Sequence, residues 1–122
     1  MMRKISIAAE YAQVVILDPT AKVEVPLWKR DVPCVASDTC ILCGCLHEQF
    51  GDTEITFGPA AEITCDLTVV FDGVLKTPGR KIAMESVWAD PILDAPTAGI
   101  ETRVRIWSNR SVFPDKVVIA YG

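Results

Sequence analysis

The dominant pattern along this chain is alternation of apolar with polar or mixed side chains, which is the period of a β-strand. Ile100, Thr102, Val104 and Ile106 alternate with Glu, Arg and Trp, so this stretch predicts a strand with one face on a core. Residues 63–71 and 82–88 alternate in the same way. Stretches rich in Val, Ile, Thr and aromatic residues predict further strands at 4–8, 12–18, 22–28, 39–46, 54–57 and 116–121.

Turn-forming residues separate these stretches. The chain has 8 prolines, and their even spread leaves little room for a long helix. Thr77, Pro78 and Gly79 predict a hairpin turn between two strands. Many short strands at this spacing are typical of a sandwich or a barrel, and the clean apolar faces favour the sandwich. We therefore expect one all-β domain over residues 1–122, an antiparallel β-sandwich of about eight or nine short strands.

Composition fits a domain that folds without disulfides or metal. Hydrophobic residues make up 50% of the 122 positions, which is enough for a real core. Arg3 and Lys4 precede an apolar stretch as in a signal peptide, but Glu10 and Gln13 interrupt it. No apolar run approaches the roughly 20 residues that cross a membrane. We expect a cytoplasmic protein with no membrane contact.

Charge is distributed unevenly along the chain. The formal net charge is −4, which argues against direct nucleic-acid binding, since that needs a basic surface. Residues 31–75 contain eight acids and no Lys or Arg, whereas the remainder is net basic. These acids either solvate a surface or form a patch for a basic protein partner. Glu48, Asp52 and Glu54 are the candidates for that patch.

A cysteine-rich segment offers a metal site as an alternative. Cys40, Cys43, Cys45 and His47 supply zinc-ligand types, and Cys-x-x-Cys is a common knuckle spacing. The second cysteine pair of a strong zinc signature is missing, and apolar residues lie between the ligands. Buried core cysteines therefore remain the favoured interpretation, with no metal or cofactor. A zinc-stabilised interaction module remains the alternative.

No decisive catalytic motif is present. His47 is the only histidine, so a Cys-His nucleophile would have to use it together with Cys43 or Cys45. No glycine-rich turn or helix start offers an oxyanion pocket for such a site. A small thiol-dependent enzyme is thus a second alternative, and we expect binding rather than catalysis, with no catalytic residue assigned.

The polar face of the best-defined strand is a second candidate surface. Arg103, Arg105 and Trp107 project from the same side of this strand, and arginine beside an exposed tryptophan is common at interfaces. The alternative is that the arginines cover the ring and pair with neighbouring acids.

Three stretches carry a family resemblance. They are Tyr11-Ala12-Gln13-Val14-Val15-Ile16-Leu17-Asp18 followed by Trp28, then Ile82-Ala83-Met84-Glu85-Ser86-Val87, and then the Pro–Gly turn and strand over residues 95–107. In this order the chain resembles the competence protein J family, the inhibitor partners of bacterial DNA-entry nucleases. The cysteine-rich segment departs from that pattern. The resemblance implies a small β-sandwich that binds a nuclease and blocks it. We expect a protein partner such as a basic nuclease, with a homodimer left open.

Overall fold

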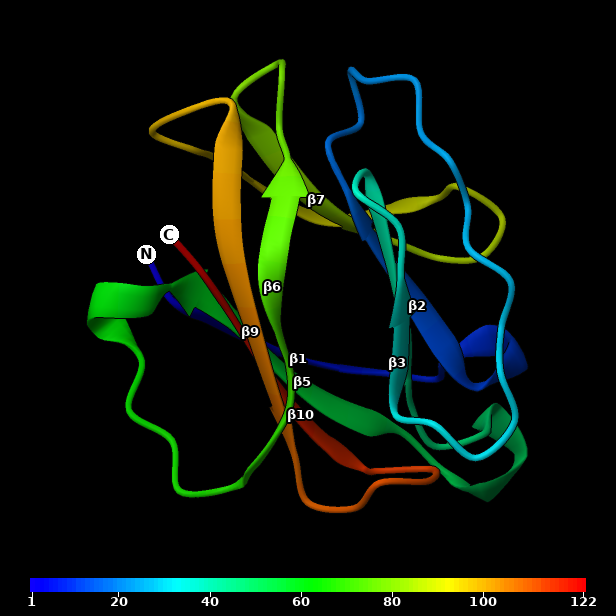
Figure 1. Cartoon of the computed structure of the whole chain (residues 1–122). Helices are drawn as coiled ribbons and strands as arrows, with labels where there is room; N and C mark the ends of the chain where they lie inside the picture. Colours follow the sequence, from blue (N-terminus) through cyan, green and yellow to red (C-terminus); the bar gives the residue numbers. More distant parts are fainter.

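Ten β-strands form two five-stranded sheets that pack face to face in this computed structural model, which describes all residues from 1 to 122 (Figure 1). In spatial order, the first sheet contains β1 (Arg3–Ile7), β5 (Thr53–Pro59), β10 (Lys116–Tyr121), β9 (Glu101–Ser108) and β6 (Thr68–Lys76). The second sheet contains β3 (Cys34–Ala36), β4 (Cys40–Gly44), β2 (Gln13–Leu17), β7 (Lys81–Glu85) and β8 (Pro91–Pro96). The predicted β-sandwich is confirmed, with ten strands instead of about eight or nine.

Helical structure is limited to three single turns. They are the 3-10 helices η1 (Glu10–Ala12), η2 (Glu48–Phe50) and η3 (Ala60–Glu62). None of the helices is long and apolar enough to span a membrane. Neighbouring strands run antiparallel except β5 and β10, which pair in parallel. These two strands lie far apart along the chain, so no hairpin turn fixes their direction.

The core lies between the sheets and is formed by alternate residues of each strand. In β9, Thr102, Val104 and Ile106 are buried, as the alternation predicts, while Glu101 and Arg103 are exposed. The largest fully buried side chains come from both sheets: Val14, Ile16, Ile41, Ile55, Phe57, Leu75, Ile82, Met84, Val104, Ile106, Val117 and Ile119.

The first half of the predicted strand at 63–71 and the whole of that at 22–28 are irregular segments, whereas residues 68–71 belong to β6. Residues 63–67 and 22–28 pair with no strand, although their sequences alternate or are rich in Val. Residues 60–67 form the green loop beside the first sheet in Figure 1, on the side away from the second sheet. Thr56 and Ala120 alternate with core residues of β5 and β10 and so face away from the second sheet, yet both are buried. In the 63–67 segment, Ile63, Cys65 and Leu67 are half-buried whereas Thr64 and Asp66 are exposed, so this segment has a sheltered side without a hydrogen-bonded partner strand. In the 22–28 segment, Val25 and Leu27 are exposed.

The expected hairpin turn at Thr77-Pro78-Gly79 is also wrong, because β6 and β7 belong to different sheets. The turn is a crossover held by the buried carboxylate of Asp18. Oδ2 of Asp18 accepts a hydrogen bond from the Gly79 amide at 2.6 Å, and its Oδ1 accepts from the amide and hydroxyl of Thr20 at 2.8 and 2.7 Å. The Thr77 and Thr102 hydroxyls lie 2.8 Å apart behind it.

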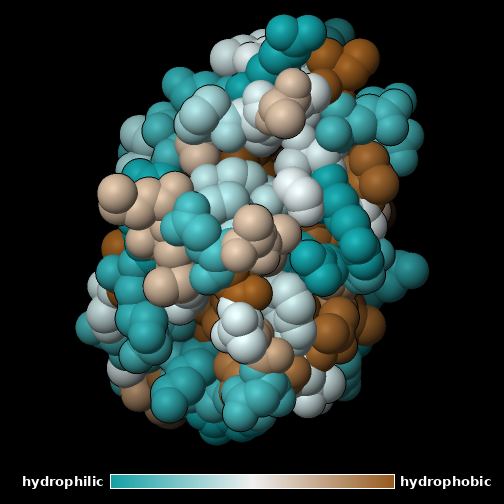
Figure 2. All heavy atoms as spheres, turned by 90° about the vertical axis from the view of Figure 1, so that its left-hand side faces the viewer, coloured by the Kyte–Doolittle hydropathy of each residue, from teal (hydrophilic) through white to brown (hydrophobic).

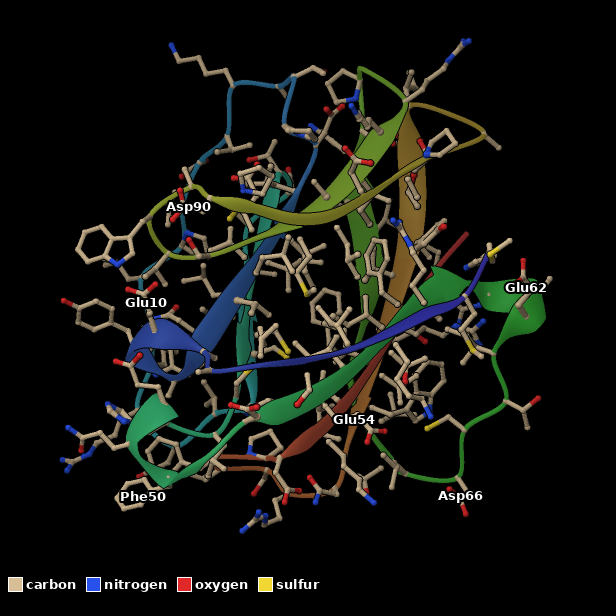
Figure 3. All side chains as sticks on the ribbon, turned by 180° about the vertical axis from the view of Figure 1, so that it is seen from behind. Glu10, Phe50, Glu54, Glu62, Asp66 and Asp90 are labelled. Carbon is tan, nitrogen blue, oxygen red and sulfur yellow. The ribbon has the colours of Figure 1, made fainter.

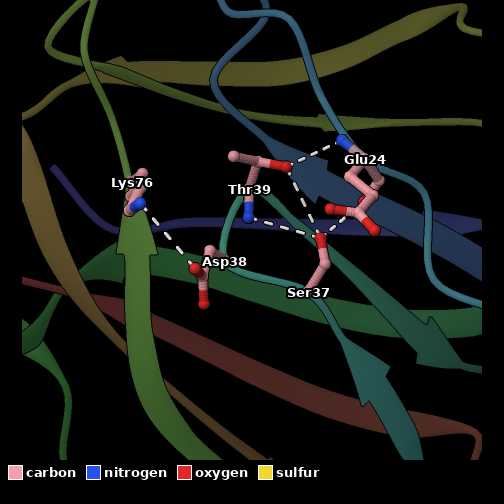
Figure 4. A network of polar contacts seen from close by, with 5 residues as sticks. All are labelled: Glu24, Ser37, Asp38, Thr39 and Lys76. Atoms are coloured by element: carbon pink, nitrogen blue, oxygen red, sulfur yellow. Dashed lines mark hydrogen bonds and ion pairs between the residues drawn. The ribbon is translucent and has the colours of Figure 1, made fainter.

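The β3–β4 turn links three parts of the fold (Figure 4). Lys76, at the end of β6 in the other sheet, donates its amide to the Asp38 carbonyl at 2.8 Å, and its Nζ lies 3.7 Å from the Asp38 carboxylate. The Glu24 amide donates to Thr39 Oγ1 at 2.8 Å, and Ser37 donates its hydroxyl to the Glu24 carbonyl at 2.5 Å. This turn therefore holds the irregular 22–28 segment and the opposite sheet together.

Candidate functional site

One end of the sandwich presents aromatic rings to solvent. At this end the chain crosses between sheets twice, through η1 from β1 to β2 and through η2 from β4 to β5. Tyr11 of η1 is 63% exposed, Phe50 of η2 is 77% exposed, and Trp88 of the β7–β8 turn is 60% exposed. Exposed apolar side chains that gather in one region often mark an interaction site, so the three rings at this end mark a candidate binding surface.

These rings lie among carboxylates. The indole Nε1 of Trp88 donates a hydrogen bond to Glu10 at 2.5 Å, and the Trp88 and Tyr11 rings meet edge to face at 5.7 Å. In Figure 3, Glu10, Phe50 and Asp90 lie along one side of the molecule, while Glu62 and Asp66 lie on the other. The acidic–aromatic end is defined here as Glu10, Tyr11, Glu48, Phe50, Trp88 and Asp90.

Local sequence explains the shape of η2. His47 caps its start, because Nδ1 accepts a hydrogen bond from the Gln49 amide at 3.1 Å. Gly51 ends it with φ of 131°, a conformation that other residues rarely adopt. The His47 and Phe50 rings lie 6.1 Å apart, so the short turn fixes the direction in which Phe50 projects.

A hollow of about 500 Å³ adjoins this surface. Tyr11, Ala12, Asp31 and Phe113 line it, and all four have φ between 50° and 61°. They are four of the six residues other than glycine with positive φ in the chain. This left-handed conformation costs non-glycine residues on the order of 1–3 kcal/mol each, and such strain concentrates at functional sites. Arg30 and Ser111 add polar groups to the lining.

The acid-rich segment of the sequence does not form one continuous patch. Four of its carboxylates lie within 4.0 Å of a cation: Asp38 with Lys76, Glu54 with Lys4, Glu62 with the terminal amine, and Asp72 with Arg103. Asp31, Glu48, Asp52 and Asp66 form no ion pair. Uncompensated charge is therefore present at Glu48 in η2 and at Asp52 just beyond it.

The six residues expected to bind a partner separate into two places. Glu48 and Asp52 lie at or beside the acidic–aromatic end, with Asp52 accepting a 3.4 Å hydrogen bond from Ser6. Glu54 is on β5, where its carboxylate lies 3.6 Å from Lys4. It belongs to the first sheet, as does β9 with the remaining three residues.

The arginines of β9 are occupied within the chain. Arg103 pairs with Asp72 at 2.7 Å, and the guanidinium of Arg105 lies 5.6 Å from the centre of the Trp107 ring. The Arg103 hydrogen bond lowers the pKa of Asp72, and Asp72 in turn raises that of Arg103. Figure 2 faces this side of the molecule and shows hydrophilic and hydrophobic residues intermingled rather than one apolar area. This arrangement matches the alternative in which arginines cover the ring and pair with acids.

The structure does not bring Cys40, Cys43, Cys45 and His47 together as a metal site. Cys43 and Cys45 belong to the core between the sheets. Cys40 is an even number of residues from the outward Leu42, so it faces the other side of its sheet. No group of three or more His, Cys, Asp or Glu side chains is arranged to hold a metal ion.

The buried thiols also lack the features of an activated nucleophile. Burial raises the pKa of the Cys45 thiol to about 12 and that of Cys40 to about 11. Reactive cysteines instead have lowered pKa values beside cations or helix starts. The only histidine uses its Nδ1 to cap η2.

Sequence reasoning missed most of the acidic–aromatic end. Trp88 is the last residue of the predicted 82–88 strand, and Glu10, Tyr11 and Asp90 lie outside the predicted strands. One feature of the sequence could have indicated the exposure of Trp88. It is followed by Ala-Asp-Pro, which is typical of a turn, and a ring in a turn is poorly placed to reach the core. Their proximity depends on the way in which η1 and the β7–β8 turn meet.

Among solved structures, the chain is similar to ComJ from Bacillus subtilis, an inhibitor of the DNA-degrading activity of NucA. The TM-score is 0.71, the match covers 99% of this chain and 97% of ComJ, and the sequence identity is 14%. No protein-family model and no curated protein sequence matches the chain. The resemblance seen in three short stretches is therefore confirmed at the level of the whole fold: this chain has a ComJ-like β-sandwich.

Proposed function

We propose that this chain is a protein-binding module of the cytoplasm that inhibits a DNA-degrading nuclease, and that its acidic–aromatic end contacts the enzyme. The observation that carries the proposal is the fold match to ComJ over almost the whole of both chains. Fold alone does not determine function, so the proposal also depends on the chemistry of the surface.

The chemistry of this end suits a basic partner. A nuclease that binds DNA must present cationic groups to phosphates, and carboxylates compete for those groups. Glu48 and Asp90 are exposed, and neither is paired with a cation of this chain. Rings such as Phe50 add apolar area, and Lys or Arg side chains of a partner stack favourably on aromatic faces.

The outer face of the first sheet, around β9, is less suited to this role. Glu54, Arg103 and Arg105 already contact Lys4, Asp72 and Trp107 respectively. A partner would have to break those contacts before it gained new ones. The proposal therefore assigns Glu48 and Asp52 to the interface. The β9 face is the alternative contact surface, and the test must distinguish between the two.

A nuclease assay with matched charge reversals tests the proposal. DNA degradation by NucA, and by the nuclease of the organism that makes this chain, is measured while the chain is titrated. We expect inhibition by the unmodified chain, and Glu48→Lys should weaken it about tenfold or more. Glu101→Lys makes the same change in net charge at the end of β9, where it should weaken inhibition less than about twofold.

Two results would contradict the proposal. No inhibition of either nuclease at micromolar chain would exclude the inhibitory role. Equal weakening by the two reversals would show that net charge, rather than the acidic–aromatic end, determines binding.

A further inference from the structure

Two cysteines stand directly opposite each other at the edge of the second sheet. Cys34 of β3 and Cys43 of β4 are register partners. The Gly44 amide donates to the Pro33 carbonyl on one side of this pair, and the Ser37 amide donates to the Cys40 carbonyl three steps along the ladder. Narrow and wide pairs alternate in an antiparallel ladder, so Cys34 and Cys43 form a non-hydrogen-bonded pair.

This kind of pair has the spacing of a disulfide. Its Cα atoms lie about 4.5 Å apart, and disulfides span Cα separations of about 4.4–6.8 Å. The Cys43 side chain is in the core cluster and Cys34 packs against it. Contact with the Cys34 thiol, together with burial, raises the pKa of the Cys43 thiol well above its ordinary value. The two sulfurs are thus neighbours on the same side of the sheet.

The other cysteines are less suitably placed. Cys45 is diagonal to Cys34, two residues beyond its register partner. Cys40 faces the outer side of the sheet, and Cys65 lies in the irregular 63–67 segment of the first-sheet side. One pair therefore stands out from the five thiols.

Solvent reaches one member of the pair. Cys34 is half-buried on an edge strand and lines a shallow hollow of about 450 Å³ together with Lys29. Cys43 is buried. Thiol–disulfide exchange requires access to the attacking sulfur, so reaction is expected to start at Cys34.

We propose that Cys34 and Cys43 form a reversible disulfide when the chain meets a low-molecular-weight disulfide such as oxidised glutathione. The Cys34 thiolate attacks one sulfur of the small disulfide and expels one small thiolate, which leaves a mixed disulfide on Cys34. The Cys43 thiol loses its proton, attacks the Cys34 sulfur and expels the second small thiolate. The two protein thiols lose two electrons and two protons, and the small disulfide is reduced to two thiols.

The bond would fasten β3 to β4 beside the segment that leads to the candidate site. Asp31 and Val32 line the hollow next to the acidic–aromatic end and lie just before Cys34. Oxidation therefore stiffens one wall of that hollow. It also restricts the unfolded chain, so the melting temperature is expected to rise by roughly 5–10 °C.

Peptide mapping tests the proposal. The purified chain is incubated with oxidised glutathione, free thiols are alkylated, and the product is digested without reduction. Trypsin cannot separate the cysteines, because no Lys or Arg lies between residues 31 and 75. Cleavage before aspartates instead gives 31–37 with Cys34, 38–51 with Cys40, Cys43 and Cys45, and 52–65 with Cys65. We expect a linked 31–37 and 38–51 pair whose fragmentation places the bond at Cys43.

Variants decide the assignment. Cys34→Ser should abolish the link and the rise in melting temperature, whereas Cys65→Ser, a half-buried control, should retain both. Because Cys34 is only half-buried, its serine variant tests the proposal without removing a core side chain as Cys43→Ser would. A bond to Cys40 or Cys45 or a stable glutathione adduct on Cys34 would overturn the proposal.

Discussion

The two ends of this sandwich use polar residues in opposite ways. At the end where β6 crosses to β7, the Asp18 carboxylate is fully buried and bound by Thr20 and Gly79. At the other end, Glu48 and Phe50 are exposed, and the backbone of Tyr11 is in a left-handed conformation. At the first end, called the closed end, the polar groups form hydrogen bonds within the chain. At the second, called the open end, which is the acidic–aromatic end, charged side chains and rings are exposed to a partner and the backbone is strained. Stability and binding are therefore expected to respond to different substitutions.

Loss of the Asp18 carboxylate should have the largest effect on stability. Asp18→Ala removes a buried carboxylate and leaves three part-buried donors without their acceptor. We expect the free energy of unfolding to fall by about 3 kcal/mol in urea denaturation. Asp52→Ala removes an exposed aspartate with one long hydrogen bond, and should change it by less than about 0.5 kcal/mol. Similar losses for both variants would contradict the comparison.

The Asp18 carboxylate should also make the free energy of unfolding depend on pH. Burial alone would raise the pKa of Asp18, but hydrogen bonds from Thr20 and Gly79 outweigh it, so the pKa lies below its ordinary value of 3.8. The folded state therefore favours the ionised form, and its contribution is present above about pH 4 and is lost as the pH falls further. The difference in unfolding free energy between the unmodified chain and Asp18→Asn should shrink between about pH 5 and pH 2. A difference that stays constant over this range would exclude the ionised carboxylate as its source.

Crowding at the closed end gives the next largest effect. A Cβ at Gly79 would lie 1.8 Å from Thr20 Oγ1 and 3.0 Å from Asp18 Oδ2. Thr20 can only move aside by giving up its hydrogen bond to Asp18, so Gly79→Ala should lower the free energy of unfolding by about 2 kcal/mol. At Gly99, in the β8–β9 crossover, the nearest atom is 3.9 Å from the Cβ position. Gly99→Ala is the matched control, and an equal loss there would remove the steric explanation.

At the open end, binding should change more than stability. Trp88→Ala removes an exposed ring and its contacts with Glu10 and Tyr11. We expect affinity for the nuclease to fall about tenfold, which is about 1.4 kcal/mol, by calorimetric titration. Leu27→Ala removes a side chain that is 89% exposed on the irregular 22–28 segment, and should leave affinity unchanged. Loss of affinity in both variants would mean that the contact surface extends well beyond this end.

Relief of backbone strain gives the smallest effect, and its sign is opposite. Ala12 has φ of 57°, which glycine adopts without the steric cost that alanine pays. Ala12→Gly should raise the free energy of unfolding by about 0.5 kcal/mol, because the relieved strain exceeds the extra entropy of the unfolded chain. Ala98, in the β8–β9 crossover, is not among the residues with positive φ, so Ala98→Gly should lower it. Equal losses at both positions would show that Ala12 is unstrained.

The sequence predicted the sandwich because period two reports one-sided burial. That relation holds in β9, where Val104 and Ile106 face the core. It misled at residues 63–67, because a loop lying along a sheet also has one sheltered side. At residues 22–28 it was the composition that misled, since Val25 and Leu27 are exposed. The two edge strands of the second sheet were missed because they lack a strand-like pattern: β3 has three residues, and β8 begins and ends with proline. Edge strands tolerate such residues since one side needs no partner.

The candidate site was predicted only in part for a similar reason. Local charge identified Glu48 and Asp52, but it also selected Glu54, whose partner Lys4 is fifty residues away along the chain. Likewise, Asp72 and Arg103 are brought together by β6–β9 pairing. The fold therefore determines which acids stay unpaired, and a local sequence pattern cannot predict it.

Amide hydrogen exchange on the chain with and without the nuclease tests the central claim most directly. If the open end is the contact surface, added nuclease should slow exchange in η1, η2, the β7–β8 turn and residues 110–114, and leave residues 77–80 and 97–100 unchanged. Protection confined to β6 and β9, or to the crossovers near Asp18, would contradict the account.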